Sequence, residues 1–213
     1  MPFDPSTTVA ITRRHLPHWE QTGRTYFVTF QLADSLPQDK LRQWKTERAV
    51  WLREHPEPHS ADEHEEYNRL FTQRFHEWLD TGMGACWLRQ PAISMLVEDA
   101  LRHFDGDRYL LGEYVIMPNH VHVLVTPLGE HTWPAILHSW KSYTAHQINR
   151  ALERSGPVWQ EESFDYLVRH AAQLEKFCRY IEENPLKAGL RPAEYRTDTG
   201  GQASSLSRPE DRR

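Results

Sequence analysis

Two histidines, His120 and His122, stand in the stretch VIMPNHVHVLV, which otherwise has the composition of a buried strand. Because side chains alternate between the two faces of a strand, both imidazoles would point to one face and the neighbouring valines to the other. Neutral imidazoles bind divalent ions, but two ligands rarely make a complete site. The spacing therefore indicates either half of a metal site or two polar residues on the wet face of a sheet.

A tyrosine and an asparagine, Tyr180 and Asn184, stand four residues apart in the helical sequence RYIEENPLKAGL. This spacing places them on one helix face, about one turn apart. The asparagine carbonyl is a hard oxygen ligand of the kind that Mg²⁺ or Mn²⁺ binds. The phenol, with a reference pKa of about 10, must lose its proton to attack a phosphate. The pair favours a tyrosine nucleophile beside a cation that stabilises charge on the phosphate.

The elements that must position these residues follow from the hydrophobic periodicity. Alternating aromatic and branched residues predict a strand at 24–33, and two extended runs at 108–127 are joined near Met117–Asn119. The segment 158–169 is expected to be a short strand or irregular. The last helix should end by Asn184, because the residue before Pro185 is biased away from helical geometry. Helices are predicted at 36–85 in two pieces, 90–104, 132–153 and 171–185.

The order of these elements predicts an α+β fold. It suits a ferredoxin-like antiparallel sheet with helices packed on one face. One domain would span residues 1–195, with 36–85 as a helical insertion. The tail 196–213 has almost nothing to bury and is expected to be disordered.

Composition narrows the class of protein. A net charge of −5 argues against nonspecific coating of duplex DNA, which depends on many Lys and Arg contacts to phosphates. The two cysteines, Cys86 and Cys178, support neither a disulfide framework nor a zinc–cysteine site. The chain has no apolar run long enough for a membrane span and no signal-peptide pattern at its start. A cytoplasmic protein is expected.

Several motifs together resemble a known family. MPNHVHVLV is similar to the His-hydrophobic-His signature of the HUH single-strand endonucleases. With RRHLPHW, YFVTFQL, VWQEESFDYLVR and YIEENPLKAGL, it resembles the REP-associated tyrosine transposases, over roughly residues 12–35 and 90–192. The resemblance implies an HUH nuclease fold and an enzyme that cleaves single-stranded DNA near a hairpin-forming repeat. It also implies a 5′-phosphotyrosine intermediate and a freed 3′-hydroxyl that can rejoin the DNA.

The resemblance also assigns roles to individual residues. His120 and His122 would bind Mg²⁺ or Mn²⁺, Tyr180 would be the nucleophile, and Asn184 the third ligand, where some relatives carry Gln. The segment 36–85 departs from compact relatives, so the oligomeric state stays open between monomer and dimer. Candidate DNA contacts lie in the matching segments, each with a surface or core role as the alternative: Arg13, Arg14, Lys141, Arg169 and Lys187 for phosphates, and Trp159 and Phe164 for bases.

Three alternatives remain at this point. Tyr143 is a rival nucleophile, although no matching ligand stands one turn away from it. The chain could be a domesticated hairpin-DNA binder with weak or no catalysis, although a pure binder gains nothing from the His–His–Tyr set. It could also be a hydrolase of small phosphoesters that uses the two histidines, which would leave Tyr180 unexplained.

Overall fold

Five antiparallel strands form the central sheet of the computed structural model, which describes residues 10–13, 17–20, 23–56 and 59–199. The strand order is β6-β3-β5-β4-β7, and a separate hairpin pairs β1 with β2. Strands β3, β4, β5 and β6 with the crossover helices α4 and α5 make the predicted ferredoxin-like unit. The strands are β1 (Ala10–Arg13), β2 (Pro17–Glu20), β3 (Tyr26–Gln31), β4 (Tyr109–Ile116), β5 (His120–Pro127), β6 (Phe164–Leu167) and β7 (Arg196–Asp198).

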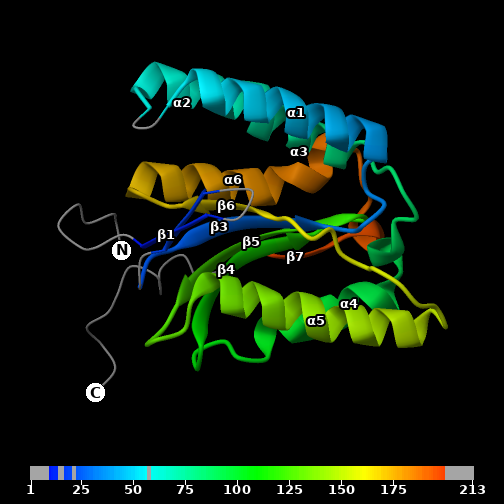
Figure 1. The fold of residues 1–213 in the computed structure, drawn as a ribbon. Helices are drawn as coiled ribbons and strands as arrows, with labels where there is room; N and C mark the ends of the chain where they lie inside the picture. The colour runs from blue at the N-terminus through cyan, green and yellow to red at the C-terminus, as the bar shows by residue number, and fades with distance from the viewer. Residues whose placement is uncertain (1–9, 14–16, 21–22, 57–58, 200–213) are drawn as a thin grey trace.

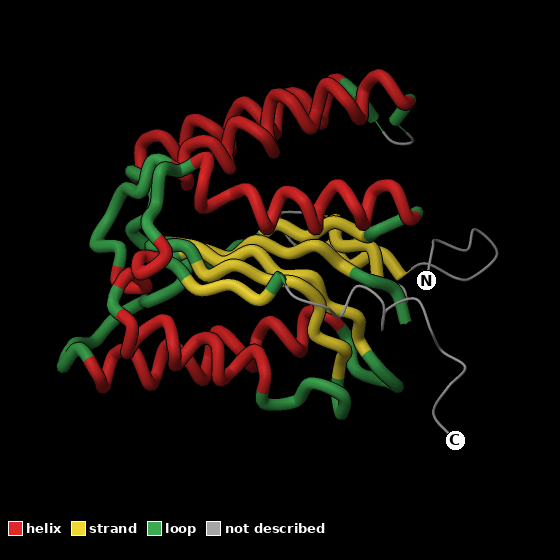
Figure 2. Tube along the Cα trace, turned by 180° about the vertical axis from the view of Figure 1, so that it is seen from behind, coloured by secondary structure: helices red, strands yellow, loops and turns green. Residues whose placement is uncertain are grey.

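Helices cover both faces of the sheet (Figures 1 and 2). The two crossover helices lie on one face, as predicted for the ferredoxin-like unit. The structure adds a second layer on the other face, where α6 and the helices of the segment 36–85 pack. The helices are α1 (Gln38–Glu54), α2 (Ala61–Tyr67), α3 (Arg74–Asp80), α4 (Pro91–Arg102), α5 (Trp133–Ala151) and α6 (Ala171–Lys187), with short helical turns η1 (Asn68–Gln73), η2 (Trp87–Arg89) and η3 (Pro192–Glu194).

Strand β5 is buried on both faces, so its two histidines are not on a wet surface. Val121, Val123 and Val125 pack into the main core with α4 and α5. His120 and His122 point to the other face, where both are fully buried. Because the second helical layer covers that face, the solvent-facing alternative for the two histidines is wrong.

Helix α6 continues past the point where the sequence predicts its end. Pro185 lies inside the helix, which runs to Lys187. A proline has no N–H, so one intrahelical hydrogen bond is missing there. The helix nevertheless closes normally, because the amide of Ala188 donates to the Asn184 carbonyl at 3.0 Å. The predicted end at Asn184 is therefore wrong, and the final turn carries Asn184 inward to full burial.

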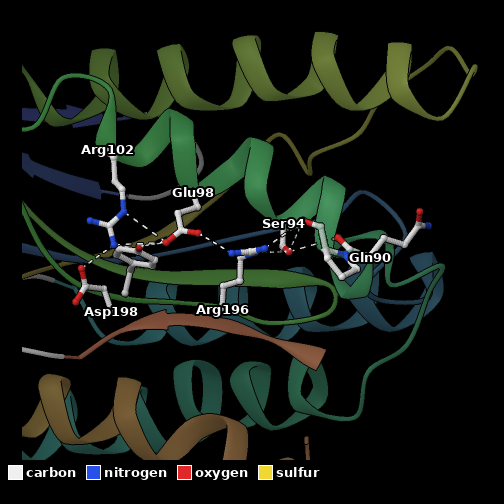
Figure 3. Close-up of polar contacts among 8 residues, drawn as sticks. Gln90, Ser94, Glu98, Arg102, Arg196 and Asp198 are labelled. Carbon is white, nitrogen blue, oxygen red and sulfur yellow. Dashed lines mark hydrogen bonds and ion pairs between the residues drawn. The ribbon is translucent and has the colours of Figure 1, made fainter. Parts of the chain in front are cut away.

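Strand β7 closes one edge of the sheet and is held by a polar network with α4 (Figure 3). The Arg196 side chain donates to Ser94 Oγ at 2.9 Å and to Glu98 Oε2 at 3.0 Å. Arg102 donates to Asp198 at 2.7 Å. Arg196 and Asp198 lie at the start of the segment 196–213, so the prediction that disorder begins at residue 196 is wrong. Residues 200–213 lie outside the described part of the chain.

We expect Arg196→Ala to lower the free energy of unfolding by roughly 1–3 kcal/mol, because Glu98 loses a charged donor at a half-buried position. Urea denaturation measures this change. The control is Arg179→Ala, since Arg179 forms an exposed ion pair with Glu175 and should change stability by less than about 0.5 kcal/mol. Wild-type stability in Arg196→Ala would show that backbone pairing with β4 alone holds β7.

Candidate metal and nucleophile site

The two imidazoles of β5 face each other on the side of the sheet that α6 covers. His120 Nε2 lies 3.0 Å from His122 Nε2. Burial lowers the pKa of His120 to about 3 and that of His122 well below its usual value, and in each case nearby histidines add to the effect. Both rings are therefore neutral, which is the form that binds metal ions.

A neighbouring asparagine fixes the tautomer of His120. The Asn119 amide nitrogen donates to the carbonyls of Leu79 and Met83, so its Oδ1 faces His120 Nδ1 at 2.8 Å. An amide oxygen only accepts, so Nδ1 carries the proton and Nε2 presents a lone pair. His122 Nδ1 lies 2.7 Å from Thr29 Oγ1, a hydroxyl that can either donate or accept. Two Nε2 lone pairs at 3.0 Å would repel unless a proton or a cation lay between them.

An aspartate that sequence reasoning missed completes this group. Asp80, the last residue of α3, places Oδ1 at 3.6 Å from His120 Nε2. Burial raises the pKa of Asp80 to about 6, and a hydrogen bond from Asn184 partly opposes that rise. In the sequence Asp80 is one of many acidic residues in a segment outside the recognised motifs. Asp80 is far from His120 in the sequence, and no local pattern indicates that the two side chains meet.

The nucleophile candidate and its helical neighbour lie in the same cluster. Asn184 Nδ2 donates to the Tyr180 hydroxyl at 3.1 Å and to the two Asp80 oxygens at 3.2 and 3.3 Å. The Tyr180 ring meets the His122 ring edge-on, with centroids 5.1 Å apart. The sequence spacing predicts that Tyr180 and Asn184 share one face of α6. In the structure this face packs against the β5 histidines of the same chain.

Burial holds the Tyr180 phenol in its protonated form. Desolvation raises the pKa of Tyr180 above its usual value, and the negative charge of Asp80 adds to the rise. The hydrogen bond from Asn184 opposes it, because it favours the phenolate oxygen. A phosphate can be attacked here only if the phenol proton is removed during the reaction.

A third buried histidine, from α3, borders the site. The His76 ring lies 5.7 Å from that of Tyr180 and 5.2 Å from that of His122, measured between centroids. Burial lowers the pKa of His76 to about 4, so it is neutral at physiological pH. Thr29 lies between His76 and His122, with its Oγ1 3.4 Å from His76 Nε2. Sequence reasoning did not single out His76 among the thirteen histidines of the chain.

The donor set fits a divalent cation. Ligand atoms of Asp80, His120 and His122 all lie within 4.8 Å of one another. Two ligands held about 2.1 Å from one ion at right angles are about 3 Å apart, which matches the separation of the two Nε2 atoms. Asn184 Oδ1 is buried and has no hydrogen-bond partner among the described residues. An unsatisfied buried oxygen on a side chain that also contacts the Asp80 carboxylate suits a site that takes up a cation.

The predicted DNA contacts divide into exposed and internal residues. Arg169 and Lys187 are exposed, and Lys187 pairs with Glu183 at 2.8 Å. Lys141 donates to the carbonyls of Gln160 and Glu161, and burial lowers its pKa to about 8. Arg14 and the side chain of Arg13 lie outside the described part of the chain.

The two aromatic residues considered for base stacking are internal. Trp159 is 7% exposed, packs edge-on against Phe30 and donates to Thr144 Oγ1. Phe164 is 9% exposed and packs against Phe75 of the insertion. A base could reach neither ring without opening the core, so the structure assigns both to packing.

The rival nucleophile lies elsewhere. Tyr143 is 53% exposed on α5, which covers the face of the sheet opposite to α6 (Figure 1). The sheet therefore separates its hydroxyl from the histidine pair. The structure brings Tyr180, and not Tyr143, to the metal-ligand candidates.

Part of the chain is similar to a known protein family. Residues 96–184 match the family model described as "Transposase IS200 like". The matched segment contains both histidines of β5, Tyr180 and Asn184, whereas Asp80 lies outside it. A solved structure, "Structure of the REP associates tyrosine transposase bound to a REP hairpin", is similar with a TM-score of 0.47 and 15% identity, covering 90% of this chain and 94% of that one. No curated protein matches the chain.

Among the described residues, no helix combines the length and apolar character that crossing a bilayer requires.

Proposed function

We propose, from the match of residues 96–184 to the IS200-like transposase family, that the chain is a transposase acting on single-stranded DNA. It cleaves and rejoins DNA at hairpin-forming, REP-like repeats through a 5′-phosphotyrosine on Tyr180. The observation that carries the proposal is the meeting of Tyr180, Asn184 and the two β5 histidines in one buried cluster of one chain. The nucleophile then serves the active site of its own chain.

The chain's residues would divide the work of cleavage. The Tyr180 oxygen attacks phosphorus and loses its proton, the bond to the 3′ oxygen breaks, and that oxygen leaves as a hydroxyl after gaining a proton. Asn184 Nδ2, already bonded to the phenol oxygen, orients it and favours its charged form. The phosphotyrosine conserves one phosphodiester bond, so the freed 3′-hydroxyl can reverse the reaction on another end without ATP.

His120, His122 and Asn184 would hold Mg²⁺ or Mn²⁺. A bound cation supplies charge stabilisation at a phosphate oxygen during the transfer. Asn119 contacts Nδ1 of His120, and Thr29 contacts Nδ1 of His122, on the side of each ring opposite to its Nε2. Such outer partners orient ligating rings and keep their lone pairs directed at one point.

The experiment that tests this function uses the full chain and a pool of single-stranded hairpin oligonucleotides with randomised flanks. With Mn²⁺ or Mg²⁺ we expect a denaturant-resistant adduct that carries the DNA downstream of the cut, together with a fragment ending in a 3′-hydroxyl. Chelation with EDTA should remove both products. Turnover of phosphoesters without any adduct would overturn the proposal in favour of a simple hydrolase, and hairpin binding without cleavage would favour a DNA-binding protein.

A further inference from the structure

The helical insertion reaches the candidate metal site at its C-terminal end. The carbonyls of Leu79 and Met83, on either side of Asp80, accept hydrogen bonds from Asn119 Nδ2 at 3.2 and 3.0 Å. Asn119 in turn contacts His120 Nδ1. A single asparagine therefore joins the end of the insertion to the first histidine of β5, and the position of Asp80 is tied to that of His120.

The insertion's return to the sheet is also fixed. The amide of Ala85 donates to Asp34 Oδ2 at 2.8 Å. Gly84 has φ +89°, and a Cβ at this position would lie 2.5 Å from the Asp34 carbonyl oxygen. Only glycine fits this backbone and this approach. The two ends of the insertion thus meet just after β3, the strand that pairs with β5.

Asp80 brings charge to a site that otherwise has neutral donors. Its Oδ1 lies 3.6 Å from His120 Nε2, and both of its oxygens accept from Asn184 Nδ2. A carboxylate with about a quarter of its side chain exposed, next to two buried neutral imidazoles, is poorly compensated without a cation. Two imidazoles and one carboxylate converging on one point form a common divalent-metal donor set.

We propose that Asp80 is a ligand of the same cation as His120 and His122, so that metal binding and docking of the insertion are one coupled event. The proposal rests on the function proposed above and adds a residue from outside the family-matched segment. The insertion is then part of the catalytic site. Asn184 links the Asp80 carboxylate to the Tyr180 hydroxyl, so a docked insertion also positions the nucleophile.

The test measures binding of Mn²⁺ alone to the full chain by titration calorimetry. We expect Asp80→Asn to weaken Mn²⁺ affinity at least about tenfold. The matched control is Glu65→Gln, which removes the same charge from an exposed position on α2 of the same insertion and should bind Mn²⁺ like the wild type. His120→Ala serves as the reference for loss of the site. Hydrogen exchange should show that Mn²⁺ slows exchange of the α3 amides in the wild type but not in Asp80→Asn.

A ligand substitution gives a direct signature that does not depend on activity. Asp80→Cys should bind Cd²⁺ with a sulfur-to-metal charge-transfer absorption that the wild type, with Cys86 and Cys178 only, does not show. Wild-type Mn²⁺ affinity in Asp80→Asn, with binding lost in His120→Ala, would overturn the role of Asp80 and leave the proposed function intact. Mn²⁺ binding that is insensitive to His120 as well would overturn the metal site itself.

Discussion

Tyr180→Phe should abolish the covalent protein–DNA adduct and lower strand cleavage by at least about a thousandfold. The phenylalanine ring retains the edge-on contacts with Phe27 and His122. The variant loses only the hydroxyl and its 3.1 Å bond from Asn184, which should cost about 1 kcal/mol of stability. Loss of activity in a folded protein would therefore report on the nucleophile. Gel analysis of labelled hairpin DNA under denaturing conditions measures the adduct.

The matched control for this experiment is Tyr143→Phe. Tyr143 is exposed on the opposite face of the sheet, and its replacement should leave both adduct formation and cleavage at wild-type levels. Adduct formation by Tyr180→Phe at the wild-type rate would contradict the assignment. If Tyr143→Phe lost the adduct instead, the nucleophile would be the rival tyrosine.

His120→Ala should weaken Mn²⁺ affinity at least about a hundredfold and reduce cleavage to the same extent at limiting metal. Removal of groups that only orient a ligand already costs 10–100-fold in metal affinity, and loss of the ligand should cost more. The substitution also leaves Asn119 Oδ1 without its imidazole donor, so some loss of stability is expected. Excess Mn²⁺ should restore part of the cleavage if the remaining donors still bind.

His138→Ala is the control for the histidine substitution. His138 is exposed on α5, far in the fold from the β5 pair, and its replacement should change neither Mn²⁺ affinity nor cleavage. Cleavage by His120→Ala at the wild-type level in limiting metal would show that the β5 histidines do not hold the catalytic cation.

Local patterns in the sequence were enough to predict the frame of the site. Alternation along β5 placed two histidines on one face, and four-residue spacing placed Tyr180 and Asn184 on one face of α6. These predictions succeed because strand and helix periods fix side-chain direction without knowledge of the rest of the fold. The order of strands and helices also led to the ferredoxin-like sheet, since few topologies accommodate it.

Features that depend on tertiary contact were not predictable in the same way. Asp80 reaches His120 because the insertion packs on the face that α6 also covers, and no local pattern encodes that docking. Helix α6 runs through Pro185 because burial of Asn184 and Pro185 overrides a local bias against helix. Tryptophan is a residue type that often stacks on bases, so the sequence alone could not show that Trp159 is internal. Its contacts with Phe30 and Thr144 are made only in the folded chain.

The most direct test of the central claim is to locate the covalent bond between protein and DNA. The adduct formed on a hairpin oligonucleotide would be digested with nuclease and protease, and the modified peptide sequenced by mass spectrometry. We predict a nucleotide phosphate on Tyr180, within the peptide that contains Asn184. A phosphate on Tyr143 or any other residue would contradict it.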